Sequence, residues 1–265
     1  MSERSADDRK KDSQSFDTVA SLYDEYRPEY PQALVESVIA FSGLPENGRI
    51  LEVGSGTGKA TRLFARRGYS IHCIEPGRNL AAVAARNLRA YPRVSFELTR
   101  FEEWQERPAQ FDLVMSAQAF HWVPSEIGYA KAARALKLGG SLALFWNMQT
   151  GFHGQVAADL DGIYREVTPG LDDPQSAIEE TIRERTEEIT RSGCFGPVTI
   201  RRFPWSQTYR TGEYVGLINT HSDHLRLPEQ TRQHLFKSVA AAIDAQGGSI
   251  ELDYVTVLYV AQKPL

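Results

Sequence analysis

The stretch ILEVGSGTGKAT, residues 50–61, places three glycines at alternate positions directly after a short apolar run. Glycine has no Cβ, so a turn rich in it can adopt left-handed backbone angles and can approach a ligand closely. Three glycines exceed what a bare strand-to-helix turn needs, although such a turn without a ligand remains the simplest alternative. The stretch therefore predicts a strand, a ligand-binding turn and a helix, and the glycine spacing decides among the possible ligands.

A Walker A loop, which binds nucleotide phosphates, requires the pattern G-x-x-x-x-G-K-[ST]. Aligning Gly58 and Lys59 with that pattern puts Val53 at the first glycine and Ala60 at the magnesium-binding hydroxyl. Two required positions therefore fail, and the lysine alone does not support a phosphate site.

The dinucleotide-binding pattern G-x-G-x-x-G fits better but is incomplete. Gly54 and Gly56 match its first two glycines, and Lys59 stands at the third, which normally lets the helix pack on its strand. Glu75 follows a strand about 20 positions later, where a carboxylate can accept hydrogen bonds from both ribose hydroxyls. An NAD(P)-dependent oxidoreductase therefore remains an alternative, provided that the fold tolerates Lys59.

Strand-like and helical segments alternate along the chain as far as residue 147. Strands are expected near 49–54, 69–76, 94–100, 111–118 and 139–147, and helices near 59–67, 78–91 and 124–136. Such alternation requires crossover connections and predicts an α/β fold with a doubly wound, mostly parallel sheet. Strand-like patterns at 198–210 and 247–263 would add two strands at one edge and make the sheet seven-stranded.

Changes in composition and pattern divide the chain into five expected parts. The first 15 residues mix charges of both signs without apolar anchors, which is typical of a disordered tail. The strand–helix alternation stops after about residue 150, where a mostly helical stretch begins. The expected parts are the tail at 1–15, an N-terminal helical cap at 16–43, a cofactor-binding core at 44–150, a helical lid inserted after the fifth strand at 151–196, and C-terminal strands and a helix at 197–265.

The composition limits the partners and the location of the protein. Its 265 residues carry a net charge of −4, so a nucleic-acid backbone is not expected as the main partner. No apolar stretch approaches the roughly 18 residues of a membrane span, and the N-terminus has no secretory hydrophobic segment. Two cysteines, Cys73 and Cys194, make no disulfide framework. A cytoplasmic monomer or homodimer with reduced thiols is the expectation.

The full glycine motif resembles a known cofactor-binding signature. Glu52, Gly54, Gly56 and Gly58 form E-x-G-x-G-x-G, which resembles motif I of the class I S-adenosylmethionine-dependent methyltransferases, enzymes with a Rossmann-like fold. Close backbone approach and helix N-terminal amides suit a ligand with a carboxylate and no phosphate. The acidic residue on the first strand would favour the ammonium group of such a ligand, directly or through water.

Three further segments extend the resemblance over residues 16–147. They are YDEYRPEYP with its R-P-x-Y-P step, LTRFEEW after the third strand, and FDLVMSAQAFHWV with an A-x-x-x-H-W step at the end of the fourth. The first and last are similar to the trans-aconitate methyltransferase-like subgroup. In these families the loop after the third strand commonly offers an acidic residue to adenine, whereas this chain has Arg100 there.

The resemblance implies two sets of site residues. The expected cofactor-binding residues are Tyr23, Arg27, Glu52, Gly54, Ser55, Gly56, Gly58, Glu75, Pro76, Arg100, Phe101, Glu102, Ser116, Ala117 and Gln118. The expected substrate-pocket residues are Tyr26, His121, Trp146, Asn147 and His221.

Methyl transfer from a sulfonium is a displacement on an activated carbon, so alignment and exclusion of water matter most. A general base is needed only for an acceptor that arrives protonated, and His121 is the candidate; packing against Trp122 explains this histidine equally well. His221 and His224 suggest a metal, but no clustered third ligand is evident and none is predicted.

We therefore predict an S-adenosylmethionine-dependent methyltransferase that acts on a small-molecule acceptor and releases S-adenosylhomocysteine. A non-catalytic S-adenosylmethionine-binding protein remains a further alternative. It would bind the cofactor without methyl turnover.

Overall fold

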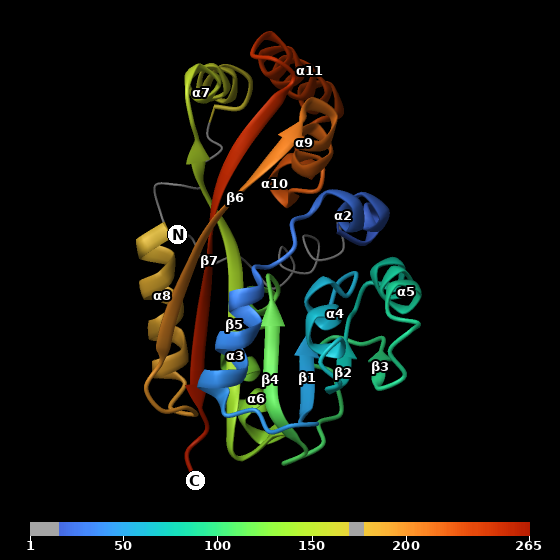
Figure 1. The fold of residues 1–265 in the computed structure, drawn as a ribbon, viewed down its shortest axis with the longest axis vertical. Helices are drawn as coiled ribbons and strands as arrows, with labels where there is room; N and C mark the ends of the chain where they lie inside the picture. The colour runs from blue at the N-terminus through green and yellow to red at the C-terminus, as the bar shows by residue number, and fades with distance from the viewer. Residues whose placement is uncertain (1–15, 170–177) are drawn as a thin grey trace.

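A computed structural model describes residues 16–169 and 178–265, so the expected tail at 1–15 lies outside the described residues. A seven-stranded sheet with the order β3-β2-β1-β4-β5-β7-β6 runs through the molecule (Figure 1). Its strands are β1 (Arg49–Val53), β2 (Ser70–Ile74), β3 (Val94–Glu97), β4 (Phe111–Ala117), β5 (Leu136–Phe152), β6 (Thr199–Arg210) and β7 (Ser249–Gln262). The expected Rossmann-like α/β sheet is confirmed.

The sheet is mixed, because its two edges pair differently. Across the sheet, β3, β2, β1, β4 and β5 pair in parallel, each with the next in this order. β7 pairs antiparallel with both β5 and β6. The last two strands do not form a tight hairpin, since three helices connect β6 to β7. The carboxyl ends of β1, β2, β4 and β5 meet at one edge, where ligands bind in folds of this type.

Helices cover both faces of the sheet. The helices are α2 (Ala20–Tyr26), α3 (Gln32–Ser42), α4 (Lys59–Ala65), α5 (Arg78–Asn87), α6 (Ser125–Ala135), α7 (Gln155–Val167), α8 (Ile178–Arg191), α9 (Thr211–Ile218), α10 (Ser222–Leu225) and α11 (Glu229–Ala245), with a 3-10 turn, η1, at Phe120–Trp122. Side chains of α3 and α4 pack on one face of the sheet, and side chains of α6 and α8 pack on the other. Part of the expected N-terminal cap, α3, thus belongs to the core layer.

The long strands β5, β6 and β7 extend beyond the parallel part of the sheet and carry a second small core. Leu160 of α7, Leu217 of α9 and Leu235 of α11 pack there against Leu252 of β7. Figure 1 shows these helices gathered at one end of the molecule, away from β1 to β3. The expected lid segment is therefore divided: α7 packs with α11, whereas α8 lies along the sheet.

The cysteines and the helices bear on the expectations drawn from composition. Cys73 and Cys194 are both free thiols. Among the helices within 16–169 and 178–265, none combines the length and the apolar character that crossing a lipid bilayer requires.

Leu258, at the centre of β7, is fully buried and tests the contribution of the antiparallel strands to the fold. Leu258→Ala should lower the free energy of unfolding by about 2–5 kcal/mol, because it removes buried methyl groups and leaves a cavity. Leu138, a leucine of β5 that is 69% exposed, is the control. Its replacement by alanine should change the free energy by less than about 0.5 kcal/mol in urea denaturation. Equal effects of the two variants would contradict the burial of β7.

Candidate functional site

The glycine turn between β1 and α4 adopts left-handed angles at all three glycines. The φ values are +71° at Gly54, +55° at Gly56 and +84° at Gly58. A Cβ on Gly54 would lie 2.4 Å from the Cβ of Ala119, and one on Gly58 would lie 2.6 Å from Leu88. Gly56 is different, since a Cβ there would meet nothing closer than the Tyr23 ring at 3.9 Å. Two glycines thus permit close packing, and the middle one faces open space.

Glu75 holds this turn from the end of β2. Its carboxylate accepts the backbone N–H of Gly56 at 2.8 Å and the backbone N–H of Gly77 at 2.8 Å. Burial raises the pKa of Glu75 to about 7, although the hydrogen bonds from the two amides lower it. The side chain also lines the adjoining cavity. The residue is therefore placed both to fix the turn and to contact a ligand.

Glu52 lies beneath the turn and does not line the cavity. It is fully buried, and one carboxylate oxygen accepts a hydrogen bond from the Thr61 hydroxyl at 2.6 Å. The other oxygen, Oε1, has no hydrogen-bond partner among the described residues. Burial raises the pKa of Glu52 to about 8, the Thr61 hydrogen bond opposes this, and the nearby Glu75 adds to it. Direct contact of Glu52 with a ligand ammonium is not the arrangement found here.

A cavity of about 480 Å³ lies over the turn, at the carboxyl ends of β1, β2 and β4 and beside residues 146–149 within β5. Most of the residues expected at the site line it together. These are Tyr23, Arg27, Gly54, Gly56, Glu75, Pro76, Arg100, Phe101, Glu102, Ala117, Gln118, His121, Trp146, Asn147 and His221.

The other expected residues lie around this cavity. Ser55 lines a small adjoining pocket beside the glycine turn, and Gly58 caps α4 behind it. Ser116 is fully buried and donates a hydrogen bond to the carbonyl of Val53 at 2.7 Å, so it links β4 to β1. Tyr26 lines a second cavity on the outer side of α2.

The polar atoms of the turn fit a polar ligand. The hydroxyls of Ser55 and Thr57 are buried and have no hydrogen-bond partner among the described residues. A buried hydroxyl without a partner is costly, so its position is best explained by a group that binds above it. The turn, the carboxylate of Glu75 and the free hydroxyls together suit a ligand with both hydroxyl and charged groups.

His121 is held by a tryptophan of the neighbouring strand. The indole Nε1–H of Trp146 donates to Nδ1 of His121 at 3.2 Å, and the ring of Trp122 packs on the imidazole at 4.4 Å. A neutral imidazole that accepts a hydrogen bond at Nδ1 carries its proton on Nε2. In this arrangement His121 has no free lone pair with which to accept a proton, which favours a positioning role.

Arg27 connects the N-terminal segment to the start of α10. Its guanidinium donates to the Thr220 hydroxyl at 2.7 Å and to the Thr220 carbonyl at 2.8 Å. The same group lies over the Tyr23 ring, 5.3 Å from the ring centre. Arg27, which was expected to bind a carboxylate, therefore also holds α2 over the cavity.

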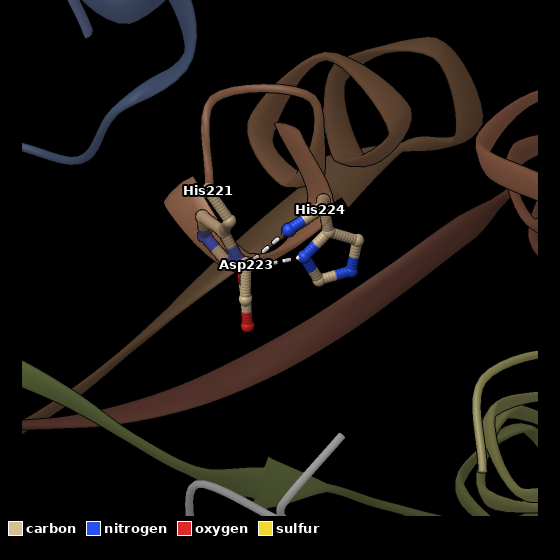
Figure 2. Close-up of side chains that lie close together, drawn as sticks. All are labelled: His221, Asp223 and His224. Atoms are coloured by element: carbon tan, nitrogen blue, oxygen red, sulfur yellow. Dashed lines mark hydrogen bonds and ion pairs between the residues drawn. The ribbon is translucent and has the colours of Figure 1, made fainter. Parts of the chain in front are cut away.

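His221, Asp223 and His224 form a cluster whose possible ligand atoms lie within 4.8 Å of one another (Figure 2). Sequence analysis found no clustered third ligand for the two histidines, whereas the structure brings Asp223 beside them. Because a carboxylate only accepts, Nδ1 of His224 donates to Asp223 at 2.8 Å, and Nε2 then accepts from the Tyr164 hydroxyl at 2.9 Å. A metal ion would have to displace one of these hydrogen bonds.

The charges around the cluster also disfavour a cation. Burial lowers the pKa of His221 well below its usual value, and the positive charge of Arg27 lowers it further. Burial raises the pKa of Asp223, but the hydrogen bonds from the ring and the backbone N–H of His224 hold it low. Arg226 also lines the cavity on this side. The absence of a metal remains a prediction.

Sequence reasoning missed Arg185, which lines the cavity from α8. The many charges of this segment suggest a solvent-covered helix, but Ile178, Ile182 and Ile189 fall on one face at helical spacing. Ile182 and Ile189 are buried against the sheet, and Ile178 packs beside them. Arg185 shares this face, seven residues after the first isoleucine and three after the second, so the spacing contained the signal.

Comparison with known proteins agrees with this geometry. Residues 50–140 match the family model of a methyltransferase domain. An uncharacterized methyltransferase-like protein of Schizosaccharomyces pombe is 25% identical over 260 residues, which are 95% of this chain and 96% of that protein. The match therefore extends over nearly the full length of both chains.

Solved structures share the fold. A candidate type II methyltransferase from Anaeromyxobacter dehalogenans has a TM-score of 0.67 and 20% identity, covering 91% of this chain and all of that one. Haemonchus contortus phosphoethanolamine N-methyltransferase 2, solved with S-adenosylhomocysteine, has a TM-score of 0.56 and 16% identity, covering 99% of this chain and 61% of that one. The family model and the relative indicate a methyltransferase domain, and the solved structures show a shared fold.

The buried carboxyl of Glu52 predicts a loss of stability at high pH. Its pKa is near 8 in the folded chain and 4.5 ordinarily, so the stabilisation is present below about pH 4.5 and is lost as the pH rises through about 8. Between these values the free energy of unfolding should fall by up to about 1.4 kcal/mol per pH unit through this group. Glu52→Gln, which keeps an acceptor for Thr61, should flatten the fall in urea midpoint between about pH 5 and 8.

Glu103→Gln is the control, because Glu103 is exposed. It should leave the pH dependence as in the unmodified protein. A Glu52→Gln variant with an unchanged slope would contradict the buried, protonated state of Glu52.

Proposed function

We propose that this chain transfers a methyl group from S-adenosylmethionine to a small-molecule acceptor. The observation that supports it most is the pairing of the open Gly56 turn with the Glu75 carboxylate at the carboxyl ends of β1 and β2. The open space over Gly56 would admit the amino-acid end of the cofactor, and Glu75 offers acceptors to ribose hydroxyls. The cavity of about 480 Å³ is of a size that suits a cofactor and a small acceptor.

The cofactor half is assigned to residues near the glycine turn. Gly54, Gly56 and Ser55 would hold the amino-acid end, Glu75 and Pro76 the ribose, and Phe101 with neighbouring backbone the adenine. Arg100 and Glu102 lie 3.7 Å apart as a side-chain pair at the adenine end. Their mutual neutralisation would explain why an arginine is tolerated where an acidic residue is common.

When bound, S-adenosylmethionine supplies a methyl group on a positively charged sulfur. The residues of this chain then have to align the acceptor and exclude water, which accounts for most of the rate enhancement in such a displacement. Trp146 and Trp122 give the acceptor half apolar walls, and the hydrogen bond from Trp146 to His121 fixes the indole. Gln118, with φ of +60°, donates to the Asn147 carbonyl at 3.2 Å and ties the ends of β4 and β5 together.

Two helices would cover the bound molecules. Tyr23 and Arg27 bring α2 over the cavity, and Ile178, Thr181 and Arg185 bring α8 to its side. We therefore propose α2 and α8 as the cover, in place of the whole segment 151–196. The trans-aconitate methyltransferase-like subgroup, the cytoplasmic location and a monomeric or homodimeric state rest on the sequence motifs and composition.

Replacing Gly56 tests the cofactor site. Gly56→Val puts a branched side chain at a φ of +55° and into the ligand space beside Tyr23. Its affinity for S-adenosylhomocysteine should fall at least about tenfold in isothermal titration calorimetry, whereas the unmodified protein should bind that nucleoside and not NADH.

Gly68→Val is the matched control. Gly68 has a φ of +84° with nothing near its Cβ position, so the backbone strain is similar and the site is remote. Its affinity for S-adenosylhomocysteine should stay unchanged. Equal affinities of the two valine variants, or binding of NADH alone, would argue against the proposed function.

Two substitutions separate a positioning role of His121 from a role as general base. His121→Asn keeps a side-chain acceptor for the Trp146 indole, and His121→Ala removes it. With any acceptor that supports turnover, the asparagine variant should retain most of kcat and the alanine variant should lose about tenfold. Equal large losses in both variants, with loss of the acidic limb of the pH–rate profile, would instead identify a base.

A further inference from the structure

Arg185 is a partly buried cation at the side of the cavity. Its guanidinium stacks on the indole of Trp146, with Cζ 3.8 Å from the ring centre. Its Nη1 and the buried hydroxyl of Tyr259 interact with each other and have no hydrogen bond to any further described residue. Burial lowers the pKa of Arg185, and the neighbouring Tyr259 and Glu188 oppose this effect.

Such a group is costly to keep. A buried cation without a full set of partners destabilises the folded chain, and leucine at the same place on α8 would continue the apolar face of Ile178, Ile182 and Ile189. The other arginines of this helix are different: Arg183 is exposed and pairs with Glu180 and Glu187. The position of Arg185 is therefore explained by a group that arrives from the cavity.

The charges of the acceptor half indicate the sign of that group. Arg185 and Arg226 line the cavity, and Arg27 lines both this cavity and the small pocket beside the glycine turn. Among the described lining residues on this side, the carboxylate is that of Asp223, and His224 already donates to it twice. Glu75 and Glu102 belong to the cofactor half, where one binds the glycine turn and the other faces Arg100.

From these contacts we infer that Arg185 selects the acceptor by binding an oxyanion, a carboxylate or a phosphate monoester, while the acceptor body packs against Trp146. The inference rests on the proposed function, whose acceptor class it names. Guanidinium and oxyanion match in geometry, because two parallel N–H groups can donate to two oxygens. Stacking on the Trp146 indole holds the Arg185 guanidinium in one plane, so the side chain loses less conformational entropy when a ligand binds.

Four probes that share a phenyl ring test this inference: benzoate, phenyl phosphate, benzamide and benzylammonium. Each is titrated calorimetrically into the complex of the protein with S-adenosylhomocysteine. At least one anion should bind about tenfold more tightly than benzamide, and benzylammonium should not bind. The anion that binds with the higher affinity, benzoate or phenyl phosphate, shows whether the site takes a carboxylate or a phosphate monoester. Failure of both anions to bind at millimolar concentration, or equal binding of benzamide, would overturn the inference.

Variants of Arg185 assign the effect to this residue. Arg185→Leu should remove the preference for the anion over benzamide, and Arg185→Lys, which keeps the charge but not the fork, should retain part of it. Arg183→Leu, on the exposed side of the same helix, should keep the full preference. An unchanged preference in Arg185→Leu would contradict the assignment.

The affinity for S-adenosylhomocysteine separates this inference from the proposed function. It should be the same in the unmodified protein, Arg185→Leu and Arg183→Leu. A loss in Arg185→Leu alone would show that Arg185 binds the cofactor, and would overturn its role in acceptor selection. If the unmodified protein does not bind S-adenosylhomocysteine, the proposed function itself fails.

Discussion

The hydrogen bond from the Gly56 amide to the Glu75 carboxylate holds together the part of the molecule on which the candidate site depends. It joins the end of β2 to the turn after β1, and it keeps the turn in left-handed angles that only glycine adopts without strain. With the turn in this shape, Gly54 packs on Ala119 and brings the end of β4 beside it. The floor of the cavity thus depends on one carboxylate and three residues without side chains.

The cavity is divided by charge, and this division follows from the order of the elements. Its cofactor half comes from the parallel strands, where Glu75 provides a carboxylate close to the loop amides. Its acceptor half is enclosed by elements that follow β5, and these contribute Arg185 and Arg226. Under the proposed function, the cofactor would meet Glu75 and the acceptor would meet arginines, which would orient the two molecules before any chemistry takes place.

Sequence patterns predicted the parallel strands and the residues at their ends, because strand periodicity and glycine spacing are local signals. They failed where long-range packing decides. Glu52 matches the motif, but it is buried under the turn, where it accepts a hydrogen bond from Thr61. Its side-chain direction depends on the pairing of β1 with the neighbouring strands. Asp223 stands between two histidines in the sequence, yet its closeness to both rings depends on the short α10 helix. Arg185 was hidden by the surrounding charges of α8, since only its register with the buried isoleucines marks the inner face.

The most direct test of this account is a crystal structure of the protein with S-adenosylhomocysteine. The account predicts the amino-acid end of the nucleoside in the space over Gly56, both ribose hydroxyls on Glu75, and the sulfur directed toward Trp146. A nucleoside bound elsewhere, with the turn vacant, would contradict it. So would a turn whose amides bind a diphosphate in preference to the amino-acid end of the nucleoside.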